Sequence, residues 1–148
     1  MKFFPKNPVT PEQIDFKNLA LPASPNHFLL VPAGFASIIS TPESPLFDYP
    51  VEELEMAWKR MIKNQPRVTL RSYSEKKRRY HYIQKGVILQ LPDYVIVQFI
   101  PVFAQQSTIA MFSYSVYGYS DFGLNRTRVF KWLIALKKEL VKSHPQEP

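Results

Sequence analysis

The period of the apolar residues changes twice along this chain, and the two changes limit the folds that it can adopt. Apolar residues recur at helical spacing over about 50–63, alternate with polar ones over about 67–117, and return to helical spacing over about 125–141. The alternating part is rich in β-branched and aromatic residues, as strands are. This order predicts an α+β fold, an antiparallel sheet of about four to five strands with two helices packed on one face.

The segment before the first helix differs from the rest because it holds eight of the fourteen prolines. Proline interrupts regular structure, so residues 1–47 are predicted to be a Pro-rich extended arm packed on the body. Residues 48–142 are the predicted α+β domain, and residues 143–148 a polar tail. The apolar cluster at 28–31 favours one edge strand within the arm. The remaining strands are predicted near 67–74, 79–91, 93–103 and 107–117.

Composition excludes several kinds of chemistry. The chain has 148 residues, of which 45% are hydrophobic and 21% charged, and this is ordinary for one globular domain. It has no cysteine, which excludes disulfides, thiolate catalysis and cysteine-ligated zinc. His27 and His144 fall in the arm and the tail, away from His81, so we expect no metal site and no cofactor.

The formal net charge of +7 favours an anionic partner: nucleic acid, a membrane surface, or an acidic small molecule or protein. A basic protein with no such partner is the alternative. The N-terminus lacks the apolar stretch of a signal peptide, and Gln98 and Pro101 interrupt the longest apolar run. We therefore expect a soluble, cytoplasmic protein without a transmembrane segment, and leave peripheral membrane contact open. The sequence does not specify an oligomeric state.

The sharpest motif joins the last strand to the last helix and reads Gly-Tyr-Ser-Asp-Phe-Gly-Leu-Asn-Arg-Thr-Arg over 118–128. In one interpretation it only shapes the junction: glycine permits unusual backbone angles, and short polar side chains accept from free helix N–H groups. The residues of that interpretation are Gly118, Asp121, Gly123 and Asn125. In the other, the helix start binds a phosphate or carboxylate. The ligand-binding candidates are Tyr119, Ser120, Arg126 and Arg128.

The same motif resembles the C-terminal signature of the family known as domain of unknown function 1499, and the similarity extends over about residues 22–140. The other positions that agree with the family are Ser24-Pro25-Asn26, Ala57-Trp58, Pro66-Arg67, His81 and Asp93. The chain departs from the family at His27, where cysteine is common, and at Tyr94 and Ile96, where acidic residues are common. The resemblance implies a small α+β domain of unassigned function, often in membrane-associated or exported proteins, and it supplies no catalytic residues.

From these observations we favour a non-catalytic binding module that holds an anionic group at the 118–128 loop. One alternative is a hydrolase-like enzyme in which His81 and Asp93 pair across neighbouring strands and Ser120 is the nucleophile. No Gly-x-Ser-x-Gly elbow surrounds that serine.

A second alternative is polyanion binding at the basic cluster formed by Lys76, Lys77, Arg78 and Arg79. Seven of the eight tyrosines fall in the sheet region, and those on the face without helices could stack on bases. The competing interpretation is a solvated hairpin tip beside half-buried strand tyrosines.

Overall fold

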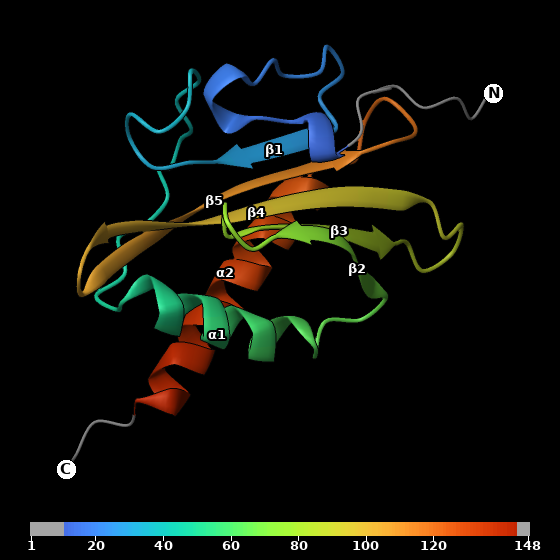
Figure 1. Cartoon of the computed structure of the whole chain (residues 1–148). Helices are drawn as coiled ribbons and strands as arrows, with labels where there is room; N and C mark the ends of the chain where they lie inside the picture. The colour runs from blue at the N-terminus through green and yellow to red at the C-terminus, as the bar shows by residue number, and fades with distance from the viewer. Residues whose placement is uncertain (1–10, 145–148) are drawn as a thin grey trace.

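The computed structural model describes residues 11–144, which form one antiparallel sheet covered on both faces. The sheet has the order β1-β5-β4-β3-β2, so β1 and β2 are its edges (Figure 1). The strands are β1 (His27–Leu30), β2 (Val68–Ser74), β3 (Arg79–Lys85), β4 (Pro92–Phe103) and β5 (Gln106–Ser115). Every neighbouring pair is antiparallel. The predicted edge strand is therefore present as β1.

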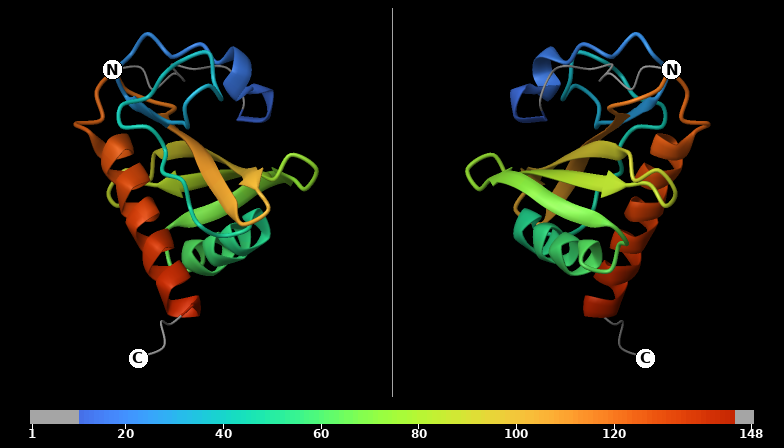
Figure 2. Two further views of the ribbon diagram at one scale, coloured as in Figure 1. Left: turned by 90° about the vertical axis from the view of Figure 1, so that its left-hand side faces the viewer. Right: turned by 90° about the vertical axis from the view of Figure 1, so that its right-hand side faces the viewer.

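Both helices pack on the same face of this sheet, as Figure 2 shows from two sides. They are α1 (Val51–Ile62) and α2 (Leu124–Ser143). Their indoles meet edge to face, with Trp58 and Trp132 centroids 5.9 Å apart, and the Trp58 Nε1 donates to the Tyr82 hydroxyl at 2.9 Å. Both tryptophans are fully buried, so this contact joins α1, α2 and β3 in one core. The predicted α+β architecture is confirmed.

The opposite face of the sheet is covered by the parts of the arm that flank β1. Two short 3-10 turns, η1 (Pro11–Gln13) and η2 (Phe16–Asn18), precede β1. A second apolar cluster forms there, in which Ile14, Phe16 and Leu19 of the arm pack against Ile96, Phe112 and Tyr114 of the sheet. Tyr114 is therefore not free to stack on a base, because its ring is fully buried under the arm. The arm residues 1–10 and tail residues 145–148 lie outside the described part.

The strand predicted over 79–91 ends earlier, at Lys85. Gly86 begins a loop that its N–H closes by donating to the Leu91 carbonyl at 3.1 Å, and Gln90 has a φ of 52°. The apolar residues 87–89 that made the segment look like a strand lie in this loop and are exposed. Within residues 11–144, no helix combines the length and the apolar character that crossing a bilayer requires.

Candidate functional site

The 118–128 loop is shaped by two glycines and one aspartate. Gly118 and Gly123 have φ of 82° and 79°, in the left-handed region that other residues rarely adopt. The Asp121 carboxylate accepts from the N–H of Gly123 at 2.8 Å and from that of Asn125 at 3.1 Å. The Ser120 hydroxyl accepts from the Phe122 N–H at 3.3 Å. A carboxylate of the chain itself therefore lies at the positive end of α2.

Below the loop, Asn125 is the centre of a buried polar network. Its Oδ1 accepts from the Ser113 hydroxyl at 2.6 Å and from Arg128 Nη1 at 2.7 Å. Its Nδ2 donates to Asp121 at 2.6 Å and to the carbonyl of Asn26 at 3.2 Å. The amide thus ties the α2 start to β5 and to the residue that precedes β1, and it leaves no capacity for an outside ligand.

Arg128 belongs to the same network, and its place corrects the expectation that it binds an external anion. Its guanidinium is buried, with Nη2 2.6 Å from Asp93 Oδ2, Nη1 3.0 Å from the Ser113 hydroxyl, and Nε donating to Gln84. Asp93 is buried as well. The charge of Arg128 is neutralised inside the fold, so this arginine fastens α2 to the sheet.

The other candidate residues of the motif remain at the surface. Tyr119 and Ser120 are exposed, and so is Arg126. The Arg126 guanidinium lies over the ring of Phe130, 4.9 Å from its centroid, and 5.7 Å from that of Phe28. Cation–π contact orients this side chain and leaves its N–H groups free to donate outward.

Arg126 begins a groove that follows the outer side of α2 for a little over three turns, as far as Lys138. The groove has a volume of about 540 Å³. The chain of α2 supplies almost all of its lining, with Gln65 from the turn after α1 as the remaining wall. Its lining residues are Gln65, Arg126, Thr127, Phe130, Lys131, Ile134, Ala135 and Lys138. The lining combines the cationic ends of Arg126, Lys131 and Lys138 with the apolar surface of Phe130, Ile134 and Ala135. Such a groove suits an anion that also carries an apolar part.

The charges of α2 are distributed unevenly. Its single acidic residue, Glu139, accepts from Arg60 of α1 at 3.0 Å and is thereby neutralised. Five cations of α2 make no ion pair with any acidic side chain that the structure describes: Arg126, Lys131, Lys137, Lys138 and Lys142. The sequence analysis missed the groove because it sought cations only in the 118–128 motif and in the basic cluster at 76–79. The available signal was the excess of lysine over acid on one helix.

Comparison with known proteins gives the family but no activity. The family model described as "Protein of unknown function (DUF1499)" matches residues 19–136. The chain belongs to the DUF1499 family. No curated protein matches it. Among solved structures, an uncharacterized protein from Bacillus thuringiensis is similar at 13% identity and a TM-score of 0.48, covering 78% of this chain and 98% of its own.

A second solved structure, of a protein from Thermus thermophilus, is similar at 10% identity and a TM-score of 0.38, covering 79% of this chain and 98% of its own. At these values neither similarity carries a functional argument. The DUF1499 motif residues nevertheless have a structural explanation here, since Asn26, Asp93, Asn125 and Arg128 meet in the buried network at the start of α2.

In this DUF1499 domain the basic cluster at 76–79 is only half available. Arg78 donates to Glu55 at 3.0 Å and to Glu52 at 3.3 Å, both on α1. Arg79 is buried and donates to Gln98 and to the Ile14 carbonyl of the arm, at 2.9 and 3.1 Å. The predicted patch is therefore corrected to Lys76 and Lys77, which are exposed at the turn between β2 and β3.

The predicted hydrolase residues do not meet. Asp93 pairs in register with Gln84 and points to the helix face, where it binds Arg128. His81 lies three residues before Gln84 on β3, roughly 10 Å along the strand. Because successive side chains of a strand point to opposite faces, this odd separation places His81 on the face opposite to that of Gln84 and Asp93. A sheet therefore separates the histidine from the aspartate, and the prediction of a catalytic pair is wrong.

His81 lies instead in a polar cluster between the sheet and the arm. Its Nδ1 is 2.9 Å from the Ser72 hydroxyl and 3.8 Å from Glu12 Oε1. Glu12 also accepts from Ser72 at 2.7 Å and from Arg71 Nε at 2.9 Å. Burial lowers the pKa of His81, although the Glu12 carboxylate opposes the shift. The imidazole is therefore held neutral at pH 7.

Burial also raises the pKa of Glu12, but hydrogen bonds from Ser72 and Arg71 outweigh it and lower the pKa to about 2. This acidic partner escaped the sequence analysis because it comes from the arm, far from the strands. His81 Nε2 and the Tyr114 hydroxyl are buried without a hydrogen-bond partner among the described residues. No three acidic or histidine side chains in residues 11–144 converge as a metal site.

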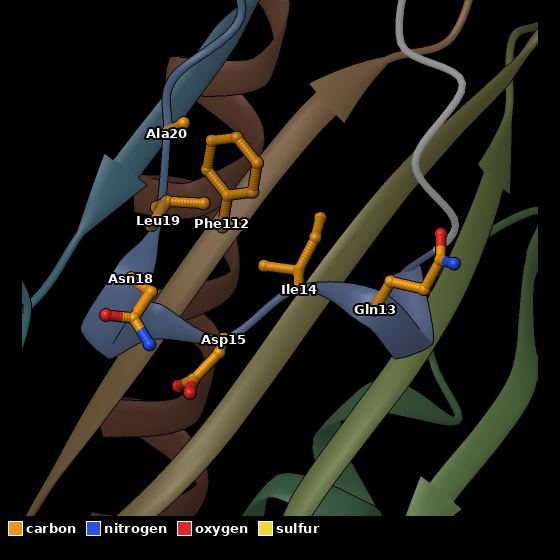
Figure 3. Close-up of a pocket in the computed structure, with 7 residues that line it drawn as sticks. All are labelled: Gln13, Ile14, Asp15, Asn18, Leu19, Ala20 and Phe112. Atoms are coloured by element: carbon orange, nitrogen blue, oxygen red, sulfur yellow. The ribbon is translucent and has the colours of Figure 1, made fainter.

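A small pocket of about 180 Å³ also lies under the arm (Figure 3). The figure shows Ile14 and Leu19 on the arm segment that crosses the strands, with Phe112 on the sheet behind them. None of the candidate residues from the sequence lines this pocket. It is a packing gap between the two layers, too small for a drug-sized ligand.

Proposed function

We propose that the domain is a non-catalytic binding module for an anionic partner, and that its binding surface runs along the outer side of α2 from the 118–128 loop. The supporting observation is that α2 presents five cations without a described acidic partner, whereas its one acid is neutralised by Arg60. On the hairpin, by contrast, Arg78 and Arg79 are engaged internally. α2 therefore presents five unpaired cations, whereas the hairpin keeps two, Lys76 and Lys77, among the described residues.

The groove adds selectivity to this charge. Arg126 is held in place by two aromatic rings, so it loses little conformational freedom when its guanidinium binds a carboxylate or phosphate. Lys131 and Lys138 line the same groove further along α2, and the two lie about 20° apart round the helix, on a common side of it. Tyr119 and Ser120 are exposed at the near end and can donate hydroxyl hydrogen bonds.

Charge reversal tests this proposal. In Arg126→Glu/Lys131→Glu, we expect affinity for a soluble polyanion, heparin or polyglutamate, to fall at least about tenfold at low salt, because two cation contacts become repulsive. The matched control is Lys76→Glu/Lys77→Glu, which changes the net charge equally at the other end of the sheet. Binding is measured by titration at two salt concentrations.

The control also separates this surface from the hairpin. If both double variants lose equal affinity, binding follows the net charge alone and the proposed surface is wrong. If only the hairpin variant loses affinity, the polyanion site is Lys76 and Lys77 instead. All four substituted side chains are exposed, so thermal unfolding of both variants should match that of the parent protein.

A further inference from the structure

One end of the sheet carries large apolar side chains in contact with solvent. In the β3–β4 loop, Ile88 is 88% exposed, and Val87 and Leu89 are exposed on either side of it. In the β5–α2 loop, Phe122 is 97% exposed. β3 and β5 run in the same direction because β4 is antiparallel to both, so the loops that follow them leave the sheet at the same end. Both figures of the whole chain show this arrangement (Figures 1 and 2).

The two loops are anchored at their bases. The Gly86 N–H donates to the Leu91 carbonyl at 3.1 Å, which closes the first loop, and the Val116 N–H reaches the Pro92 carbonyl at 3.5 Å, which joins the two. Directly beneath, Arg128 of α2 binds Asp93 at the start of β4. The apolar tips are thus presented from a fixed base, and Figure 1 shows the β3–β4 loop projecting beyond the strands.

Cations flank these tips, and the nearby carboxylates are occupied. Arg67 and Lys85 lie at the base of the β3–β4 loop, where Arg67 Nε donates to the Lys85 carbonyl at 2.9 Å. Arg126 is in the first turn of α2, four residues after Phe122. Of the acids, Asp93 is buried against Arg128, and Asp121 accepts from two backbone N–H groups. The end as a whole combines apolar tips with a positive base.

We propose that this end docks on an anionic lipid bilayer, with Ile88 and Phe122 inserted at the level of the headgroups and Arg67, Lys85 and Arg126 against the anionic headgroups. The inference rests on the proposed function and names the anionic partner as a membrane surface. Apolar insertion and attraction to anionic lipid add together in such interfacial binding. A projecting loop with an apolar tip is suited to insertion into a bilayer, because the lipids can move aside to accommodate it.

The first experiment measures co-sedimentation with vesicles of phosphatidylcholine containing phosphatidylserine, and with phosphatidylcholine alone. We expect the parent protein to bind the anionic vesicles, and Ile88→Ser and Phe122→Ser each to weaken binding about tenfold, the effect of exposing one apolar side chain again. The matched control is Phe103→Ser. Phe103 is 70% exposed but lies at the β4–β5 turn, at the opposite end of the sheet, so its loss should leave binding unchanged.

A second experiment detects insertion itself. Both native tryptophans, Trp58 and Trp132, are buried and should not respond to lipid. Tryptophan introduced by Ile88→Trp should therefore report its own surroundings, with a blue shift of emission when anionic vesicles are added. The corresponding Phe103→Trp variant should show no shift.

The outcomes separate this inference from the proposed function. If the parent protein does not bind anionic vesicles but still binds heparin through Arg126 and Lys131, the bilayer inference is overturned and the proposed function stands. If it binds neither, both are wrong. Vesicle binding that Ile88→Ser and Phe122→Ser leave unchanged, or that Phe103→Ser weakens equally, also overturns the inference, because the apolar tips then contribute nothing specific.

Discussion

The two faces of the sheet are covered by different means. On the helix face, α1 and α2 bury an aromatic core, and the buried charges of Asp93 and Arg128 beside it bind each other at 2.6 Å. On the arm face, a chain with little regular structure lies over the strands, and it is fastened by polar contacts of Glu12 and by Arg79. We therefore expect the helix face to unfold together with the sheet as one cooperative unit, and the arm to be less tightly coupled to that unit.

The largest effect is expected on the helix face. Arg128→Ala leaves the Asp93 carboxylate buried without its partner, and breaking a buried pair in this way costs about 3–5 kcal/mol of unfolding free energy. The control is Arg126→Ala, two residues away on the exposed side of the same helix, which removes only a surface cation–π contact and should cost less than about 1 kcal/mol. Denaturant unfolding measures both. Equal, small losses would contradict the structural role of Arg128.

The next prediction compares the loss of unfolding free energy at two fully buried phenylalanines, Phe99 on the helix face and Phe16 in the arm. Phe99→Ala should lower the unfolding free energy by about 3–5 kcal/mol, as is usual in a core. Phe16→Ala should lower it less, because the arm can detach while the sheet and helices remain folded. Limited proteolysis should then cut the Phe16→Ala variant in the segment before β1, residues 11–26, under conditions where the Phe99→Ala variant is cut throughout. Identical cleavage patterns would show that the arm is part of the same cooperative unit.

The sequence predicted the layers but not the direction of single charged side chains. The change of apolar period was enough for the sheet and both helices, since it reflects which side of each element is buried. The inward position of Arg128 could have been read as well, because Arg128 lies four residues before Trp132, on the apolar side of α2. Arg126, about 200° round the helix from it, faces outward.

Other contacts had no local signal. Asp93, the ion-pair partner of Arg128, has its position set by the register between β3 and β4. Glu12, the acidic partner of His81, lies in the arm, 69 positions earlier in the chain. The apolar residues 87–89 were assigned to a strand because period alone does not distinguish a strand end from an exposed apolar loop. The loop becomes recognisable only when Gly86 and Gln90 are seen to turn the chain.

The smallest expected effect is a change of stability with pH, and it arises from residues of the arm face. Burial holds the pKa of His81 below its ordinary value of 6.5, so the unfolded chain binds a proton there more readily than the folded one. Stability should therefore fall as the pH falls below 6.5, by at most about 1.4 kcal/mol per pH unit. Glu12, with its pKa lowered from 4.5 to about 2, contributes stability that is lost only between those two values.

The two groups can thus be separated by variant and by pH range. In His81→Gln, the decline in unfolding free energy between pH 6.5 and 5 should flatten, and in Glu12→Gln, the decline below pH 4.5 should flatten. Denaturant unfolding at half-unit pH steps measures both. Because His81 and Glu12 face each other across the arm contact, a decline between pH 6.5 and 5 that persists in His81→Gln would mean that protonation elsewhere, and not at the arm face, sets the acid sensitivity of the fold.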